Sequence, residues 1–394
     1  MSLKRYFSQV ASSADQSAQK KAKQSQVDLP AVDNDLLPLL DLSSPSLSSH
    51  ASIIQHFDTI AEHLFQRSYL VCCSTKRDGD PKRVLYELLE FEFYLIKPDC
   101  HSDPFTHDGE DQRLSGAWFV QFVFQKPIFC ISNRISRYFH RVPRFKASAT
   151  SGPPAYRSGS RKGLDLTIGT LNSPDSSNTQ PVQVRGGILL RTLRRVSDST
   201  VISGPSLLVD ELLRTSGAAE IPELVNEKWM GDISAFRAPS ADSNPVTLFV
   251  GVKEEAARAP PQMYKSPRIG LDLSHPSTRL DPSDRRVRYV SKPYRYFVLP
   301  HLLTANGRGQ TFLGVHNHCV NALQISKKPL LVGKIASLTG MQSQTVDKYL
   351  NTYRDALASG ELERFIGSRG KGASASPGTF LQLMGALQRR ELVE

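Results

Sequence analysis

The sequence predicts an α+β fold: a single mixed or antiparallel sheet surrounded by helices, with a disordered N-terminal tail and a small helical C-terminal region. Short β-rich runs alternate with turn residues and occasional helices, without the repeated strand–helix units or the Gly-x-Gly-x-x-Gly pattern of a parallel nucleotide-binding sheet. Hydrophobic residues make up 39% of the 394 residues, which is enough for a sizeable core. The chain becomes mainly helical from about Lys327.

Charge and composition narrow the function classes. The net charge is +11, from 49 basic and 38 acidic residues, and such an excess favours a polyanionic partner, most often nucleic acid. No apolar run approaches the roughly 18 residues that span a bilayer, and the N-terminus lacks the apolar core of a secretory signal. The cysteine count is odd without a Cys-x-x-Cys pair, which predicts neither a disulfide framework nor a zinc site. We therefore expect a soluble intracellular protein. We also expect it to be a monomer.

Residues 1–51 are expected to form the disordered tail, because their small polar residues bury too little apolar surface. Within this tail Leu3, Tyr6 and Phe7 form a short apolar hook suited to a partner's groove. The hook resembles the end of the peptide motif that docks on the replication sliding clamp, although the glutamine that opens that motif is missing. A chance aromatic pair is the alternative. A lysine cluster at residues 20–23 resembles a nuclear import signal.

The ordered part is predicted to begin at residue 52 with a helix, because apolar residues recur at helical spacing from Ile53 to Leu64. Residues 68–73 and 84–96 predict the two strands of a hairpin, since the sequence Asp78-Gly79-Asp80 between them favours a turn. We expect this sheet domain to end near residue 300.

The middle of the chain predicts more short strands and one helix. Gly204-Pro205 opens the helix, because proline is tolerated at the first helical position. Residues 120–136 lack clear periodicity and are predicted to be an insertion. The other elements are a short piece at 163–169 and strands at 187–191, 246–252 and 294–299.

Residues 301–325 are predicted to be a linker or the last element of the sheet domain, and residues 326–394 to be helical. Gly340 would form the turn of a helix-turn-helix, between Ile335-Ala336 on the first helix and Val346 and Leu350 on the second. The second helix would then present polar side chains, including Lys348, to a DNA groove or to phosphates. A protein-docking or purely structural helix pair is the alternative.

The strand at 84–96 carries the densest candidate chemistry. Side chains alternate along a strand, so Glu90, Glu92 and Tyr94 share one face, while Phe91 and Phe93 occupy the other. The apolar face is ordinary core. Two carboxylates and a tyrosine on the opposite face indicate either a solvated surface or the wall of a pocket.

The loop that follows this strand contains His101, Asp103 and His107. Imidazole and carboxylate groups at such spacing can hold zinc or manganese, which would make the protein a metal-dependent hydrolase. A loop with polar side chains in water is the alternative.

Several short motifs follow one another between residues 53 and 299, and their shared order is more specific than any single motif. The motifs are Glu90-x-Glu92-x-Tyr94, the segment from Asp103 to His107, Lys162-Gly163-Leu164, Leu189-Leu190-Arg191, Gly204-Pro205, Arg268-Ile269-Gly270 and Lys292-Pro293-x-Arg295-Tyr296. In this order of motifs the sequence resembles the alkyladenine (3-methyladenine) DNA glycosylases of the mammalian type.

The resemblance implies a nuclear DNA repair enzyme that needs no cofactor, flips a damaged purine out of double-stranded DNA and hydrolyses its N-glycosidic bond. It implies that Glu92 activates the attacking water and that Arg191 helps to hold this water. It also places the ring of Tyr94 against the extruded base and His107 in the same pocket. A carboxylate suits this chemistry because the transition state resembles an oxocarbenium ion.

One departure concerns the base pocket. The family's second stacking tyrosine is absent from the glycine-centred element, where Tyr156 and Asp165 are the candidate substrate-binding residues. The alternative functions are a non-catalytic nucleic-acid-binding protein and the metal-dependent hydrolase. The basic residues predicted to contact DNA are Arg161, Lys162, Arg268, Lys292, Arg295 and Lys348.

Overall fold

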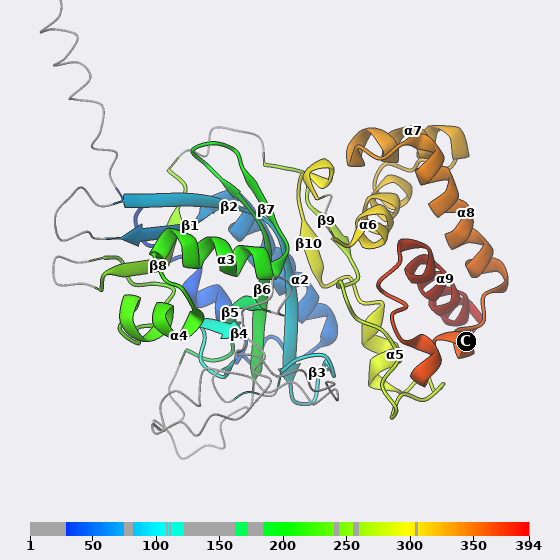
Figure 1. The fold of residues 1–394 in the computed structure, drawn as a ribbon. Helices are drawn as coiled ribbons and strands as arrows, with labels where there is room; N and C mark the ends of the chain where they lie inside the picture. The colour runs from blue at the N-terminus through cyan, green and yellow to red at the C-terminus, as the bar shows by residue number, and fades with distance from the viewer. Residues whose placement is uncertain are drawn as a thin grey trace, which may run out of the picture. The chain divides into compact units, whose positions relative to one another are not determined.

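The structure, a computed structural model, confirms the α+β fold, with helices around an antiparallel sheet (Figure 1). Val32–Glu394 forms one compact unit. Tyr156, Arg161, the hook of Leu3, Tyr6 and Phe7, the lysines at 20–23 and most of residues 120–136 lie outside the described residues. The structure describes residues 29–74, 82–107, 109, 112–121, 162–171, 184–239, 244–254, 260–303 and 306–393.

In this part of the chain, ten strands form one sheet whose main path runs β4-β5-β6-β2-β1-β8. Every pair of neighbouring strands is antiparallel, and β10 joins β2 to β9 at one side. The strands are β1 (Ser68–Ser74), β2 (Lys82–Lys97), β3 (His101–Ser102), β4 (Trp118–Gln121), β5 (Gly163–Ile168), β6 (Arg185–Arg195), β7 (Val201–Ser203), β8 (Val246–Val252), β9 (Tyr264–Ser266) and β10 (Arg295–Phe297).

Helices are distributed along the whole described chain, and none of the described helices has the length and apolar character needed to cross a bilayer. The α-helices are α2 (His50–Arg67), α3 (Pro205–Ser216), α4 (Ile221–Glu223), α5 (Arg285–Val290), α6 (Arg308–Asn321), α7 (Lys328–Thr339), α8 (Ser343–Ser359) and α9 (Pro377–Val393). The 3-10 helices are η1 (Leu37–Leu40), η6 (Pro300–Leu302), η7 (Leu362–Phe365) and η8 (Gly367–Gly370), and η5 (Leu224–Lys228) is a π-helix.

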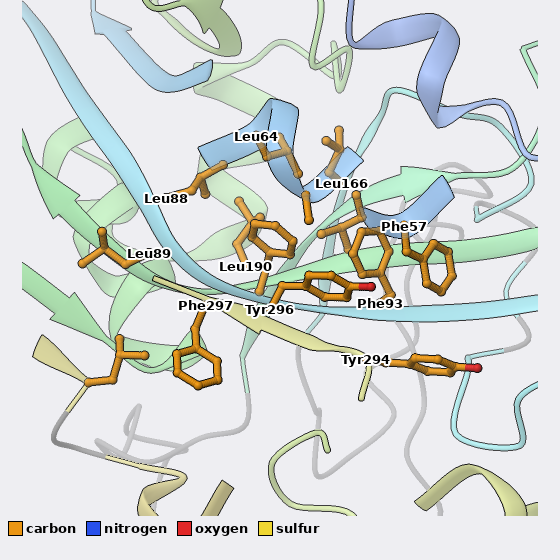
Figure 2. Close-up of a cluster of buried hydrophobic side chains, with 14 of the residues drawn as sticks. Phe57, Leu64, Leu88, Leu89, Phe93, Leu166, Leu190, Tyr294, Tyr296 and Phe297 are labelled. Carbon is orange, nitrogen blue, oxygen red and sulfur yellow. The ribbon is translucent and has the colours of Figure 1, made fainter. Parts of the chain in front are cut away.

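Helix α2 covers the apolar face of the sheet. Ser49 caps its N-terminus: the Ser49 hydroxyl accepts a hydrogen bond from the Ser52 amide, while the Ser52 hydroxyl accepts one from the Ser49 amide. This reciprocal cap satisfies backbone donors that the first helical turn leaves open. The ring of Phe57 stacks on Phe93 of β2 with the ring centres 4.1 Å apart. Figure 2 shows both rings among the buried side chains of this core.

The core begins earlier in the chain than the sequence predicted. Leu36, Leu40 and Leu42 are fully buried, although the prediction placed all residues up to 51 in a disordered tail. Asp33 accepts hydrogen bonds from the Ser68 hydroxyl and from His63, which anchors this segment to α2 and β1. These leucines lie between polar and serine-rich stretches, whose composition dominated the prediction, and burial of the leucine side chains stabilises the ordered segment.

The helices after residue 300 belong to the same compact unit as the sheet. Residues 301–325, predicted as a linker or a last element, contain α6. This helix packs closely on β9 and β10, because a Cβ at Gly314 would lie only 2.7 Å from the Lys265 carbonyl oxygen and 3.0 Å from the Phe297 ring. Between α7 and α8, Gly340 has a φ of 68°, so the predicted glycine turn is present.

We expect Gly314→Ala to lower the free energy of unfolding by about 2 kcal/mol, because the added methyl group meets backbone rather than a flexible side chain. Gly333→Ala is the matched control, since this exposed glycine of α7 has no heavy atom within 4 Å of the added Cβ. It should stabilise the protein by up to about 1 kcal/mol, the difference in helix propensity. Chemical denaturation measures the free energy of unfolding of both variants. Equal changes in this free energy would contradict the close packing of α6.

Candidate active site

An irregularity in the pairing of β2 with β6 builds the site. The register skips Leu89 in β2 and Arg191 in β6, and Glu90 lies opposite Thr192. Such a bulge turns two successive side chains toward the same face of a sheet. Arg191 and Thr192 consequently both reach Glu90, the guanidinium through Nε at 3.2 Å and the hydroxyl through Oγ1.

Glu92 lies next to this bulge and is completely buried. Its Oε1 accepts a hydrogen bond from the Ile269 amide at 2.7 Å. Its Oε2 accepts one from the Tyr94 hydroxyl at 2.9 Å and one from Arg191 Nη1 at 3.2 Å. A carboxylate offers about four lone-pair positions, so these three contacts leave room for a further donor such as water. The predicted proximity of Glu92, Tyr94 and Arg191 is therefore present.

Glu90 balances the positive charge around Glu92. It accepts a hydrogen bond from Arg295 Nε at 2.6 Å as well as the contact from Arg191. Burial alone raises the pKa of the Glu90 carboxyl, but the positive charges of Arg295 and Arg191 outweigh it and lower that pKa. Glu90 is therefore ionised at neutral pH, and it fixes Arg191 beside Glu92.

A second arginine forms the other side of the site. Arg268 pairs with Asp103, with Nη1 at 2.5 Å and Nη2 at 3.1 Å from the two carboxylate oxygens. Its guanidinium carbon lies 4.5 Å from the centre of the Tyr94 ring, a distance at which cation and ring attract each other. Burial and the charge of Glu92 raise the pKa of Tyr94 well above its usual value, so its hydroxyl remains protonated and donates to Glu92.

The structure corrects three of the predicted DNA contacts. Arg268 and Arg295 are almost completely buried and serve as internal counter-ions. Lys162 is also buried and forms an ion pair with Asp210. The sequence shows that a residue is basic but not which acid it pairs with. Because Arg268, Arg295 and Lys162 are buried and paired with acids, their side chains are not available to contact duplex DNA. Lys292 is half-buried, and Lys348 is exposed on α8.

The candidate metal ligands His101 and Asp103 are held by other groups. His101 contacts the Leu95 carbonyl oxygen through Nδ1 at 2.9 Å and the Tyr294 hydroxyl through Nε2 at 2.8 Å. Asp103 holds Arg268. The described residues contain no group of three His, Cys, Asp or Glu side chains that could hold a metal ion, so the geometry gives the metal hypothesis no support. His107 is half-buried at the end of this loop, and its place beside Glu92 remains a prediction.

Asp165 lies on the same face of the sheet as Glu92. It pairs with Leu189 of β6, which in turn pairs with Glu92 of β2. Asp165 Oδ2 accepts a hydrogen bond of 3.3 Å from Gln112 Nε2, and both side chains are buried. Sequence reasoning identified Asp165 but missed Gln112, which comes from a loop without regular periodicity.

Comparison with known proteins adds little about function. No protein-family model matches the chain. A protein of Acanthamoeba polyphaga mimivirus described as "Uncharacterized protein L759" is 28% identical over 246 residues, which cover 62% of this chain and 86% of that protein. The fold and the site thus define the class: an α+β protein with a buried carboxylate and arginine cluster on one face of its sheet.

The buried imidazole of His101 predicts acid sensitivity. Burial lowers its pKa from 6.5 to about 4, against the opposing effects of the Leu95 carbonyl and Asp103. Between these two values the unfolded chain binds more protons than the folded one, so the free energy of unfolding falls as the pH falls.

The expected loss from His101 is about 3 kcal/mol across this window. His101→Gln should be less stable at neutral pH but should lose less stability on acidification. The control His275→Gln, at an exposed histidine, should keep the parent's pH dependence. Denaturant titrations at several pH values from 7 to 4 measure the free energy of unfolding of each variant. If this free energy falls as steeply with pH in His101→Gln as in the parent, His101 is not the source of the acid sensitivity.

Proposed function

We propose that this protein is a DNA glycosylase that extrudes an alkylated or deaminated purine and hydrolyses its N-glycosidic bond. The observation that carries the proposal is the buried carboxylate of Glu92, held by Arg191, Tyr94 and the Ile269 amide. A fixed negative charge away from bulk water stabilises a sugar that becomes positive in the transition state. The ordered motifs of the resemblance support the same reaction.

The proposed step uses one water molecule and no cofactor. Glu92 accepts a proton from the water, whose oxygen bonds to C1′ of the deoxyribose as the bond from C1′ to the purine nitrogen breaks. The bonding electron pair leaves with the purine. A cationic alkylated purine departs as a neutral base, and the proton on Glu92 then passes to solvent. A deaminated purine departs as an anion, and the proton released from the water by way of Glu92 neutralises it.

The surrounding residues would position this chemistry. Arg191 bridges Glu90 and Glu92, which keeps Glu92 in place without placing a second free negative charge beside it. The guanidinium of Arg268 lies against one face of the Tyr94 ring, so a base would stack on the opposite face. Glu92 is closed to solvent in this structure; the proposal requires this covering to open when a base enters.

The wider chain supports a DNA partner. The net charge of +11 favours a polyanion, and double-stranded DNA is the substrate that the resemblance implies. A nuclear location, binding of the sliding clamp through Leu3, Tyr6 and Phe7, and a monomeric state belong to the same proposal.

A non-catalytic DNA-binding function is the second candidate. It is favoured by the helix pair α7 and α8, which the glycine turn at Gly340 connects. The exposed side chains of α8 include Gln344, Lys348 and Asn351, residue types that contact phosphates and base edges. This surface is also compatible with the enzyme, because a glycosylase needs DNA contacts away from its pocket.

The test measures base release from methylated duplex DNA by the full-length chain and by Glu92→Gln. We expect the parent to release a methylated purine and the variant to be slower by at least about 100-fold, since an activating carboxylate contributes on this order. Glu87→Gln is the matched control, because Glu87 lies on the same strand but pairs with Arg194 near the surface. This control should keep the parent's activity.

Two outcomes would overturn the enzyme proposal: no base released by the folded parent, or equal activity of Glu92→Gln and the parent. If the parent binds duplex DNA without releasing a base, and Lys348→Glu rather than Glu92→Gln weakens that binding, the second function holds. Thermal unfolding of each variant verifies that it is folded.

A further inference from the structure

A second buried acid projects from the same face of the sheet as Glu92. Asp165, Leu189 and Glu92 are directly paired across β5, β6 and β2, so all three side chains project from one face of the sheet. Neighbouring strands lie about 4.8 Å apart, which places the backbones of the two acids roughly 10 Å apart. The two carboxylates therefore stand on opposite sides of β6.

Leu189 stands directly between the two acids, and the neighbouring position on the same face of β6, Gly187, carries no side chain. Gly187 pairs with Tyr94 on one side and with Thr167 on the other. A Cβ at Gly187 would lie 3.1 Å from Asp165 Cβ and 3.2 Å from Asp165 Oδ2. The Asp165 side chain thus leans over β6 toward the strand of Glu92 and Tyr94, and no side chain at position 187 separates it from Tyr94.

Gln112 adds a second acceptor beside Asp165. An ionised carboxylate only accepts hydrogen bonds, so the Gln112 amide nitrogen must be the atom that faces it. The amide oxygen Oε1 is then left buried without a hydrogen-bond partner, in a side chain that is only 1% exposed. A buried acceptor of this kind is costly unless a ligand or water supplies a donor. The Gln112 amide oxygen thus presents an acceptor beside the Asp165 carboxylate, which suits a ligand with several donors.

From this arrangement we propose that Asp165 and Gln112 form the base-recognition subsite and select guanine-type bases, 7-methylguanine above 3-methyladenine. This inference rests on the glycosylase proposal. Guanine presents two neighbouring donors on its pairing edge, N1–H and the exocyclic amino group, whereas adenine presents one donor next to an acceptor. With the sugar carbon at Glu92, the pairing edge of a purine over Gly187 points toward Asp165.

The experiment uses dimethyl-sulfate-treated duplex DNA, which contains both methylated purines, and separates the released bases by chromatography. The full-length parent should release 7-methylguanine with the higher kcat/KM. Asp165→Asn replaces an acceptor by a donor and should lower that value on the order of 10- to 100-fold, the range of one lost paired contact. Release of 3-methyladenine should change by less than about 3-fold.

Two further variants accompany this measurement. Gln112→Leu removes the amide and should also lower 7-methylguanine release selectively, which keeps the test valid if Asp165→Asn fails to fold. Asp198→Asn is the matched control, since this exposed aspartate pairs with Arg195 outside the site. It should leave both rates at the parent's values.

The outcomes separate this inference from the glycosylase proposal. Release of 3-methyladenine in preference to 7-methylguanine, or an equal loss of both in Asp165→Asn, would overturn the subsite and leave the enzyme standing. If no base is released, the enzyme proposal fails, and binding of an oligonucleotide with one 7-methylguanine then decides the subsite. If the parent binds the 7-methylguanine oligonucleotide more tightly than unmodified DNA, and Asp165→Asn loses this preference, the subsite is supported. If the parent binds both oligonucleotides equally, the subsite is overturned.

Discussion

The contact of Arg191 with Glu90 and Glu92 is the interaction on which the site depends. All three groups are buried, so removing the arginine would leave two carboxylates without their shared counter-charge. Breaking a buried pair in this way typically costs about 3–5 kcal/mol. The bulge between β2 and β6 makes the contact possible, because a regular register would send Arg191 and Thr192 to opposite faces. The bulge is therefore a structural requirement for the contacts of Arg191 with both carboxylates.

The same charge cluster joins the sheet to the C-terminal helices. Arg295 contacts Glu90 and donates to the Ser266 hydroxyl, and it also donates to the Thr311 hydroxyl of α6 at 3.0 Å. Together with the close approach at Gly314, this contact ties α6 to the strands beside the site. If the helix pair α7 and α8 binds DNA, its position relative to Glu92 is constrained through α6. That constraint is what an enzyme needs to place a target base.

Much of the fold could be predicted because it follows local patterns. The helical spacing from Ile53 to Leu64, the hairpin strands and the Gly204-Pro205 helix start all appear in the structure. The early boundary of order could not be predicted in the same way. Leu36, Leu40 and Leu42 lie in a short leucine-rich stretch between polar and serine-rich segments, and only their contacts with distant elements show that they are buried.

The site was predictable to the extent that strand alternation and motif order reveal it. Glu92 and Tyr94 share a face because they are two residues apart, and Arg191 follows from the Leu-Leu-Arg motif. The burial of Arg268 and Arg295 depends on the distant acids Asp103 and Glu90, and no local pattern reports such a pairing. The role predicted for these two arginines, contact with DNA, was wrong because both side chains are buried.

The most direct test of the central claim is the affinity of the full-length chain for duplex DNA that carries a cationic pyrrolidine in place of one deoxyribose. This group imitates the positive sugar of the transition state, which an enzyme of this kind binds more tightly than its substrate. The account predicts tighter binding than to a neutral tetrahydrofuran analogue, and a loss of this preference in Glu92→Gln. Equal binding of both analogues by the parent would contradict it.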